Sequence, residues 1–104
     1  MAVAQLQKMY YYTYILYSSK SRNFYYGYTE NLKERLNLHQ SGKVISTKPF
    51  LPWKLVWYCA FENMKLAKDF ELYLKSESGK AFAYKRLLNS GALKKDNLIR
   101  YSEA

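Results

Sequence analysis

The pattern of hydrophobic and polar positions predicts a β-hairpin near the start of the chain. The run YYYTYILY, residues 10–17, consists mostly of the aromatic and β-branched types that strands favour, and the polar run SSKSRN after it is typical of a turn. The run NFYYGY, residues 23–28, predicts a second short strand. Side chains alternate between the two faces of a strand. One face of the hairpin is therefore expected to carry Tyr10, Tyr12, Tyr14, Tyr25 and Gly27.

A helix and a third strand are predicted next. Thr29 can cap a helix that runs to about Gln40, with Leu32 and Leu36 facing inward. A basic loop with two prolines, SGKVISTKPFLP, follows it. Residues 53–61, WKLVWYCAF, alternate in a way that predicts a strand. Its apolar face is expected to carry Trp53, Leu55, Trp57, Cys59 and Phe61.

Two more helices complete the pattern. Asn63 can cap the first of them, and the segment SESGK is expected to end it at Gly79. The run AFAYKRLLNSG predicts a short last helix that ends near Gly91. The apolar stripe of the first helix is expected to consist of Leu66, Phe70, Tyr73 and Leu74. The resulting order, β-β-α-β-α-α, predicts an α+β fold in which helices cover a small antiparallel sheet.

Length and composition indicate one folded domain. The 104 residues give room for one modest core, and 49% hydrophobic and 18% aromatic residues exclude compositional disorder. The domain is expected over residues 10–90, between a flexible extension, 1–9, and a polar tail, 91–104. The single cysteine, Cys59, allows neither an internal disulfide nor a cysteine-based zinc site. The single cysteine fits a reducing compartment, so the protein is expected in the cytoplasm. No membrane-length apolar run or signal-peptide pattern is present.

The positive charge of the chain indicates which class of partner the protein binds. Seventeen Lys and Arg residues against eight Asp and Glu give a formal net charge of +9, spread along the sequence. Such a charge on a folded, aromatic-rich domain favours an anionic polymer, nucleic acid above all. A solubilising surface or a ribosome-associated protein would carry the same charge, so charge alone does not separate these classes.

Three groups of residues could carry chemistry, and each has a structural alternative. Arg35 and His39 lie one helical turn apart, so they form either a phosphate-binding pair or part of an exposed basic helix face. The hairpin tyrosines could hold or deprotonate a water if cations or a metal lower a pKa of about 10, or they simply pack. Glu71 could be the single protein ligand of a mostly hydrated Mg²⁺, or the i,i+4 ion-pair partner of Lys75.

The order and spacing of these residues resemble a known family. The pattern consists of Tyr12-Thr13-Tyr14, Tyr25-Tyr26-Gly27, Asn31-Leu32, Arg35, His39, PWKLV and Glu71. Over nearly the whole folded part the chain resembles the GIY-YIG nuclease domain, as it occurs in small stand-alone bacterial members and at the N-terminus of an excision-repair nuclease subunit. The resemblance implies a three-stranded antiparallel sheet flanked by helices. It also implies a metal-dependent endonuclease that hydrolyses phosphodiester bonds in DNA.

The resemblance assigns a role to each matched residue. Tyr14 and Tyr25 match the two motif tyrosines, one of which would orient and deprotonate the attacking water. Gly27 matches the closing glycine of the second motif. Arg35 matches the catalytic arginine that neutralises the phosphate oxygens, and Glu71 matches the metal-binding glutamate, which would hold one Mg²⁺ or Mn²⁺ ion per site.

Three further positions agree less closely with the family pattern or match a residue that only some members carry. His39 matches a histidine that is frequent in such members, and it would support a tyrosine hydroxyl or contact the phosphate. Tyr12 stands where the first motif usually begins with glycine. Asn89 is the only nearby candidate for an asparagine that many members carry after the glutamate.

The expected substrate follows from the resemblance and the charge. Contacts to the DNA backbone, which position DNA without reading bases, are expected from Lys33, Lys43, Lys48 and Lys54. Relatives that cut defined sites carry an additional DNA-binding domain. We therefore expect low sequence specificity, recognition of branched or single-strand-containing DNA, or a protein partner that supplies specificity, in repair, recombination or clearance of foreign DNA. The oligomeric state stays open. The alternative hypothesis is a non-catalytic, basic nucleic-acid-binding module in which Glu71 is structural.

Overall fold

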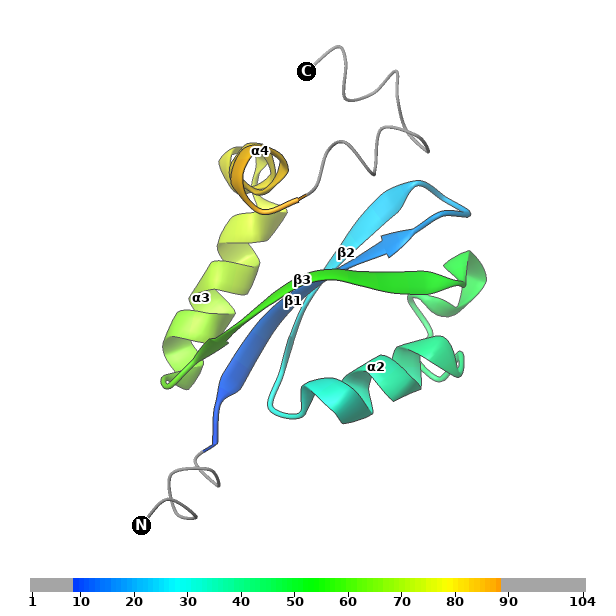
Figure 1. Cartoon of the computed structure of the whole chain (residues 1–104), viewed down its shortest axis with the longest axis horizontal. Helices are drawn as coiled ribbons and strands as arrows, with labels where there is room; N and C mark the ends of the chain where they lie inside the picture. Colours follow the sequence, from blue (N-terminus) through cyan, green and yellow to red (C-terminus); the bar gives the residue numbers. More distant parts are fainter. Residues whose placement is uncertain (1–8, 89–104) are drawn as a thin grey trace.

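A computed structural model of the chain describes residues 9–88, and in it helices lie against both faces of a three-stranded antiparallel sheet (Figure 1). The elements in chain order are β1 (Tyr11–Ser18), β2 (Asn23–Thr29), α2 (Leu32–Gln40), the 3₁₀ helix η1 (Lys48–Phe50), β3 (Trp53–Phe61), α3 (Met64–Lys75) and α4 (Glu77–Arg86). The predicted α+β class and element order are confirmed. No helix within the described residues is long and apolar enough to cross a membrane.

The sheet places the two motif strands side by side. Strand β1 is central and pairs antiparallel with β2 and with β3, so β2 and β3 are the two edge strands. Tyr14 lies opposite Gly27, and Leu16 lies opposite Tyr25. Residues directly opposite each other point to the same face of a sheet. The prediction that Tyr14, Tyr25 and Gly27 share a face is therefore confirmed, whereas Tyr10 precedes the first strand.

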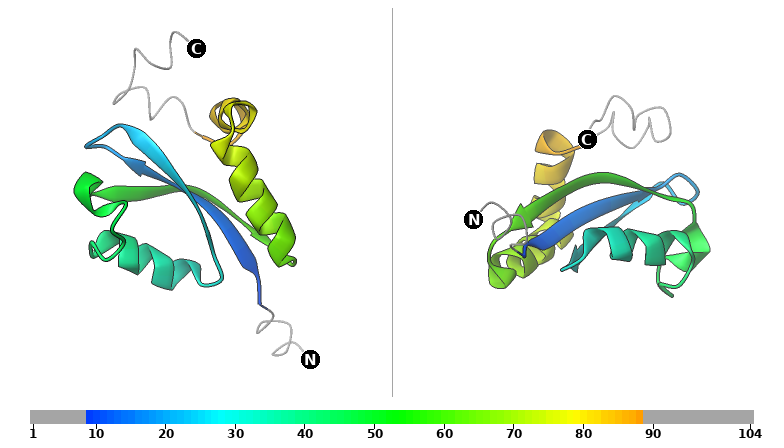
Figure 2. Two further views of the ribbon diagram at one scale, coloured as in Figure 1. Left: turned by 180° about the vertical axis from the view of Figure 1, so that it is seen from behind. Right: turned by 60° about the horizontal axis from the view of Figure 1, so that its bottom comes forward.

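Each face of the sheet has its own hydrophobic core. On one face, Tyr14, Leu16 and Trp53 are buried under α2, whose Leu32 and Leu36 pack against them as predicted. We call this cluster the α2-side core. On the other face, the buried residues under α3 and α4 form the α3-side core, which consists of Ile15, Tyr17, Tyr26, Leu74, Ala83 and Leu88. Figure 2 shows α2 against one face and α3 with α4 against the other.

A β-bulge in β3 contradicts the prediction of one continuous apolar face. Trp57 lies opposite Ile15, but the next pair joins Leu55 to Leu16, so Val56 is an extra residue that shifts the register. Because a shift of one residue exchanges the two faces, β3 changes sides at this point. On the α2 side it presents Trp53 and Leu55. On the α3 side it presents Trp57, Cys59 and Phe61.

The start of α2 differs by two residues from the prediction. Asn31, not Thr29, is the N-cap, because its backbone is still extended and its side chain accepts from the Glu34 N–H at 3.1 Å. The helix ends at a glycine in the left-handed region: Gly42 has φ +77°, and the N–H of Lys43 donates to the carbonyl of Leu38. This ending turns the chain back toward the sheet directly after His39.

The apolar stripe of α3 is rotated from the predicted one. Asn63 caps the helix as expected, and its side chain accepts from the Leu66 N–H. Leu66, however, is 55% exposed, whereas Ala67 is fully buried. The Thr13 hydroxyl donates to the Ala67 carbonyl at 2.7 Å, so this turn of α3 lies directly against β1. The stripe that faces the sheet consists of Ala67, Phe70 and Leu74.

The break between the last two helices also differs from the prediction. Helix α3 ends at Lys75, and Ser76 caps α4 by accepting from the Gly79 N–H. Gly79 is therefore buried inside α4 and does not end a helix. A Cβ there would lie 1.7 Å from the Tyr73 carbonyl oxygen, so only glycine fits this corner. Helix α4 ends at Arg86, so the predicted end near Gly91 is wrong. Residues 1–8 of the predicted extension, Asn89 and the predicted tail over 91–104 lie outside the described residues.

Candidate active site

Gly27 allows the side chain of Tyr14 to cross the edge strand β2. A Cβ on Gly27 would lie 2.4 Å from Cζ and 2.5 Å from the hydroxyl oxygen of Tyr14, closer than any real contact. The motif glycine is thus required by a close approach of a ring to the backbone. Tyr14 is fully buried, and its hydroxyl lies 2.8 Å from Nε2 of His39.

His39 links Tyr14 to a buried threonine in the loop after α2. The imidazole is fully buried, and its Nδ1 lies 2.9 Å from the hydroxyl of Thr47, which is also buried. The Thr47 hydroxyl donates to the Val44 carbonyl at 3.3 Å, so it accepts from Nδ1–H of His39. Nε2 is then the acceptor for the Tyr14 hydroxyl proton. Trp53 fixes the loop by donating its indole N–H to the Thr47 carbonyl at 2.8 Å.

Burial keeps both Tyr14 and His39 neutral. Burial, reinforced by the positive charge of Arg35, lowers the pKa of His39 from 6.5 to about 4. Burial also raises the pKa of Tyr14 to about 12, which outweighs the opposing effect of Arg35. Near pH 7 the imidazole is therefore uncharged and the Tyr14 phenol is protonated. The hydrogen bond between Tyr14 and His39 therefore fixes the positions of two uncharged side chains.

Arg35 lies beside the two motif tyrosines with an unused donor. Its side chain projects from α2, and the hydroxyl of Tyr14, followed by that of Tyr25, raises the pKa of the guanidinium. The Nε atom of Arg35 is buried and, among residues 9–88, has no hydrogen-bond partner. A buried donor without a partner is costly unless a ligand supplies the acceptor. A phosphate oxygen suits a guanidinium in both charge and geometry.

Glu71 lies on α3, which packs on the face of the sheet opposite α2. It lies one turn after Ala67, which the hydrogen bond from Thr13 holds against β1. The ion pair with Lys75 is present, with Nζ and Oε2 2.8 Å apart, and the Glu71 side chain is 19% exposed. The negative charge of Glu71 also contributes to the raised pKa of Tyr14, which relates the two residues electrostatically.

The donor set around Glu71 fits only one kind of metal site. No group of three or more His, Cys, Asp or Glu side chains that could hold a metal occurs within the described part of the chain. A single, partly exposed carboxylate suits a hard cation such as Mg²⁺, which keeps most of its waters. A cation there would compete with Lys75 for the carboxylate.

The predicted site residues thus fall into two groups. The structure brings Tyr14, Tyr25, Gly27, Arg35 and His39 together, whereas Glu71 lies on α3, on the opposite face of the sheet from α2. The four lysines expected to contact the DNA backbone are exposed; they are Lys33, Lys43, Lys48 and Lys54. Their role stays a prediction.

Two residues that hold the site together were missed by sequence reasoning. Thr47 lies in an irregular loop, where no periodicity marks it as buried, and Thr13 occurs in the first motif run without any sign of its bond to α3. Neither residue carries a local pattern that distinguishes it from the other threonines. Their importance follows only from the contacts that the fold creates.

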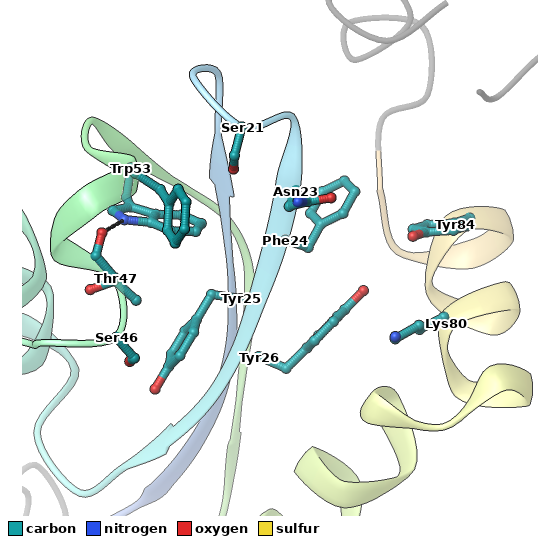
Figure 3. Close-up of a pocket in the computed structure, with 11 residues that line it drawn as sticks. Ser21, Asn23, Phe24, Tyr25, Tyr26, Ser46, Thr47, Trp53, Lys80 and Tyr84 are labelled. Atoms are coloured by element: carbon teal, nitrogen blue, oxygen red, sulfur yellow. Dashed lines mark hydrogen bonds between the residues drawn. The ribbon is translucent and has the colours of Figure 1, made fainter. Parts of the chain in front are cut away.

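A cavity of about 360 Å³ continues from the cluster along β2 (Figure 3). Its lining consists of Ser21, Asn23, Phe24, Tyr25, Tyr26, Ser46, Thr47, Phe50, Trp53, Lys80 and Tyr84. Tyr25 belongs to both the cavity and the cluster, and its hydroxyl points away from Trp53 (Figure 3). Tyr25 also meets the rings of His39 and Trp53 edge-on, at centroid distances of 5.0 and 6.2 Å.

The motif residues that the fold brings together occur in the order that the GIY-YIG family pattern predicts. The sequence matches the family model of the GIY-YIG catalytic domain over residues 10–85. The chain therefore belongs to this family, as the motif spacing predicted.

Its curated relatives are small bacterial proteins of similar length. The chain is 35% identical over 86 residues to the UPF0213 protein in the ldhD 5′ region of Pediococcus acidilactici, an alignment that covers 80% of this chain and 86% of that protein. It is 36% identical over 94 residues to the UPF0213 protein YsiG of Lactococcus lactis, covering 89% and 88% of the two chains. A UPF0213 protein of Clostridium perfringens is 33% identical over 87 residues, covering 83% and 90%. No solved structure matches the chain significantly.

Proposed function

We propose that this protein is a divalent-metal-dependent DNA endonuclease that hydrolyses phosphodiester bonds with low sequence specificity. The observation that carries the proposal is the partly exposed guanidinium of Arg35, which lies beside both motif tyrosines and whose Nε has no partner among the described residues. Phosphodiester hydrolysis needs charge stabilisation of the phosphate, and a preorganised guanidinium supplies it. Membership of the GIY-YIG family supports the same reaction class.

Within this proposal the two motif tyrosines have different roles. Tyr14 is enclosed, bonded to His39 and protonated, with a pKa of about 12, so it positions its neighbours. Tyr25 is only partly buried and borders the cavity, where a water and a phosphate could reach it. We assign to Tyr25 the orientation of the attacking water. As a phenolate, Tyr25 would take the water's proton while the water oxygen bonds to phosphorus, the bond from phosphorus to the leaving oxygen breaks, and solvent protonates the leaving oxygen. Arg35 binds the non-bridging phosphate oxygens.

Glu71 would hold one Mg²⁺ or Mn²⁺ ion, with waters as the remaining ligands. A bound ion would stabilise the charge that develops on the phosphate and on the departing oxygen. His39 fixes the position of the Tyr14 hydroxyl, beside which the guanidinium of Arg35 lies. The lysines that we expect to contact the DNA backbone would add affinity without reading sequence.

The wider setting is part of the proposal. We place the activity in the cytoplasm, in the repair, recombination or processing of foreign DNA, on branched or single-strand-containing substrates. A protein partner would supply any site specificity. The net charge of +9 supports a nucleic-acid substrate, since it raises the local concentration of a polyanion.

The test is a nicking assay with two matched α3 variants. Supercoiled plasmid and branched, flapped or single-stranded oligonucleotides are incubated with Mg²⁺ or Mn²⁺. Glu71→Gln is compared with Asp69→Asn, because Asp69 is the other carboxylate of α3 and also forms an i,i+4 ion pair, with Lys65 at 2.7 Å. We expect cleavage to fall at least about 100-fold in Glu71→Gln and to persist in Asp69→Asn. Removal of the metal with EDTA should abolish the wild-type activity.

Two results would overturn the proposal. Unchanged cleavage in Glu71→Gln would exclude Glu71 as the metal ligand and so exclude this mechanism. DNA binding without cleavage on any substrate, with either metal, would identify the protein as the non-catalytic binding module.

A further inference from the structure

The cavity along β2 straddles the open edge of the sheet. Strand β2 is an edge strand, and its side chains alternate between the two faces. Tyr25 borders the cavity on the α2 side, whereas Phe24 and Tyr26 border it on the α3 side (Figure 3). Lys80 and Tyr84 of α4 form the wall beyond them (Figure 3). Tyr25 lines the cavity and also belongs to the cluster that contains Tyr14 and Arg35, so the cavity begins at that cluster.

Aromatic rings dominate the walls. Phe24 and Tyr84 have ring centroids 5.7 Å apart, and Tyr25 and Trp53 have centroids 6.2 Å apart, so rings line both sides of the edge strand. Phe50 is 41% exposed at the rim. Its backbone is fixed, since the Ser18 hydroxyl donates to the Phe50 carbonyl at 2.7 Å. An exposed ring on an anchored backbone is a surface on which a base can stack.

Lys80 is the only charged residue among those that line the cavity. No carboxylate lines it, and Lys80 has no ion pair with a residue of the described part. The remaining polar groups are neutral hydroxyls and an amide. One cation among aromatic rings and neutral polar groups suits a ligand that has both a flat base and a phosphate.

The cavity is large enough for an unpaired nucleotide but too small for paired DNA. About 360 Å³ is at the small end of ligand pockets, enough for one nucleotide but not for a double helix. In a duplex the faces of the bases are stacked on each other and are not available to protein rings. Only an unpaired nucleotide can present its face to the cavity.

We infer that the β2-edge cavity binds an unpaired nucleotide of the DNA next to the phosphate held by Arg35, with its base against the aromatic wall and its phosphate on Lys80. The inference rests on the proposed function, since it names the substrate that the same site prefers: DNA with a single-stranded segment. It also gives a role to Lys80, which sequence reasoning had not singled out.

The experiment measures binding in EDTA, where no cleavage occurs. Fluorescence anisotropy gives the Kd of a labelled single-stranded oligonucleotide and of the blunt duplex of the same sequence. Phe50→Ala is compared with Phe82→Ala, an aromatic of α4 with a similar exposure, 38%, that does not line the cavity. Lys80→Gln is compared with Lys85→Gln, an exposed lysine of the same helix. Circular dichroism confirms that each variant is folded.

We expect single strands to bind more tightly than duplex. Phe50→Ala should weaken single-strand binding roughly ten-fold, as loss of one stacking partner does. Lys80→Gln should lower the slope of log K against log salt by about 0.7 for single strands, because one phosphate contact is lost. Phe82→Ala should change the Kd for single strands by no more than about two-fold, and Lys85→Gln should leave the slope unchanged.

The possible outcomes separate this inference from the proposed function. If duplex binds as tightly as single strands, or if both cavity variants bind like their controls, the inference is wrong even though metal-dependent cleavage stands. If the cavity variants lose single-strand binding but the wild type never cleaves, the cavity is a nucleotide site in a protein that is not a nuclease.

Discussion

At the scale of single residues, the neutral state of His39 is the most direct consequence of the fold. Its pKa is lowered from 6.5 to about 4 by burial and by Arg35. An unfolded chain takes up a proton on this side chain as the pH falls through 6.5, whereas the folded protein does not until about pH 4. His39 therefore favours the folded state fully above pH 6.5, and this contribution is lost as the pH falls toward 4.

The first prediction concerns this titration. Because His39 is the only histidine, its imidazole protons can be followed by NMR in the untagged protein without ambiguity. We expect a pKa of about 4. Between pH 6.5 and 4 the free energy of unfolding should fall by on the order of 3 kcal/mol more in the wild type than in His39→Gln. A titration near pH 6.5 would show that the buried network does not exist in solution.

The second prediction concerns Thr47, whose hydroxyl accepts from Nδ1–H of His39. Thr47→Val keeps the shape but leaves that N–H without a partner, which should cost about 1–3 kcal/mol of stability. Cleavage should fall about ten-fold, since His39 no longer holds one tautomer against Tyr14. Thr47→Ser keeps the hydroxyl and should retain most of the activity. If serine and valine lose equal activity, the hydroxyl has no positioning role, and the methyl group is what matters. Imidazole ¹⁵N shifts would report the tautomer directly.

At the scale of elements, the sequence predicted the type and order of the strands and helices but not their rotation. Alternation in WKLVWYCAF indicated a strand correctly, yet the extra residue Val56 moves Trp57 to the other face. A bulge is set by the pairing of two strands, so no pattern within one strand reveals it. The predicted apolar stripe of α3 is wrong for a similar reason. The hydrogen bond from Thr13 to the Ala67 carbonyl is a tertiary contact, which no pattern within the helix reveals.

The corner between α3 and α4 gives the third prediction. In an exposed helix, replacing glycine by alanine stabilises by about 1 kcal/mol. Gly79 is different, because the new Cβ would lie 1.7 Å from a backbone atom, the Tyr73 carbonyl oxygen, which cannot move without displacing α4. We expect Gly79→Ala to lower Tm by roughly 5–15 °C, as overpacking of a buried contact does. Thermal unfolding of Gly79→Ala and of its neighbour Ser78→Ala, whose residue is exposed, would test the contact. A stabilised Gly79→Ala protein would mean that helix propensity outweighs the corner geometry.

At the scale of the whole molecule, the sequence identified the cluster through its spacing, while the fold explains why these residues meet. Tyr14 and Tyr25 come from adjacent strands, Arg35 and His39 from one face of α2, and Glu71 from the helix on the opposite face of the sheet. Tyr14 reaches His39 and Arg35 because Gly27 opens the edge strand to its ring. The cavity beside them could not be predicted, since its lining comes from four separate parts of the chain and includes the irregular loop before β3.

The fourth prediction uses this geometry to sort the basic residues. A net charge of +9 attracts DNA to the whole surface, but only cations that contact phosphates release counterions and set the salt dependence of binding. Lys48 lies between Thr47 and Phe50 on the loop that borders the cavity, whereas Lys54 lies on β3, the edge strand farthest from β2. Lys48→Gln should therefore lower the slope of log K against log salt for a flapped duplex by about 0.9, and Lys54→Gln should lower it clearly less. Equal loss in the two variants would mean that DNA follows the basic surface as a whole and not the edge of β2, so that the bound strand would need another path to Arg35.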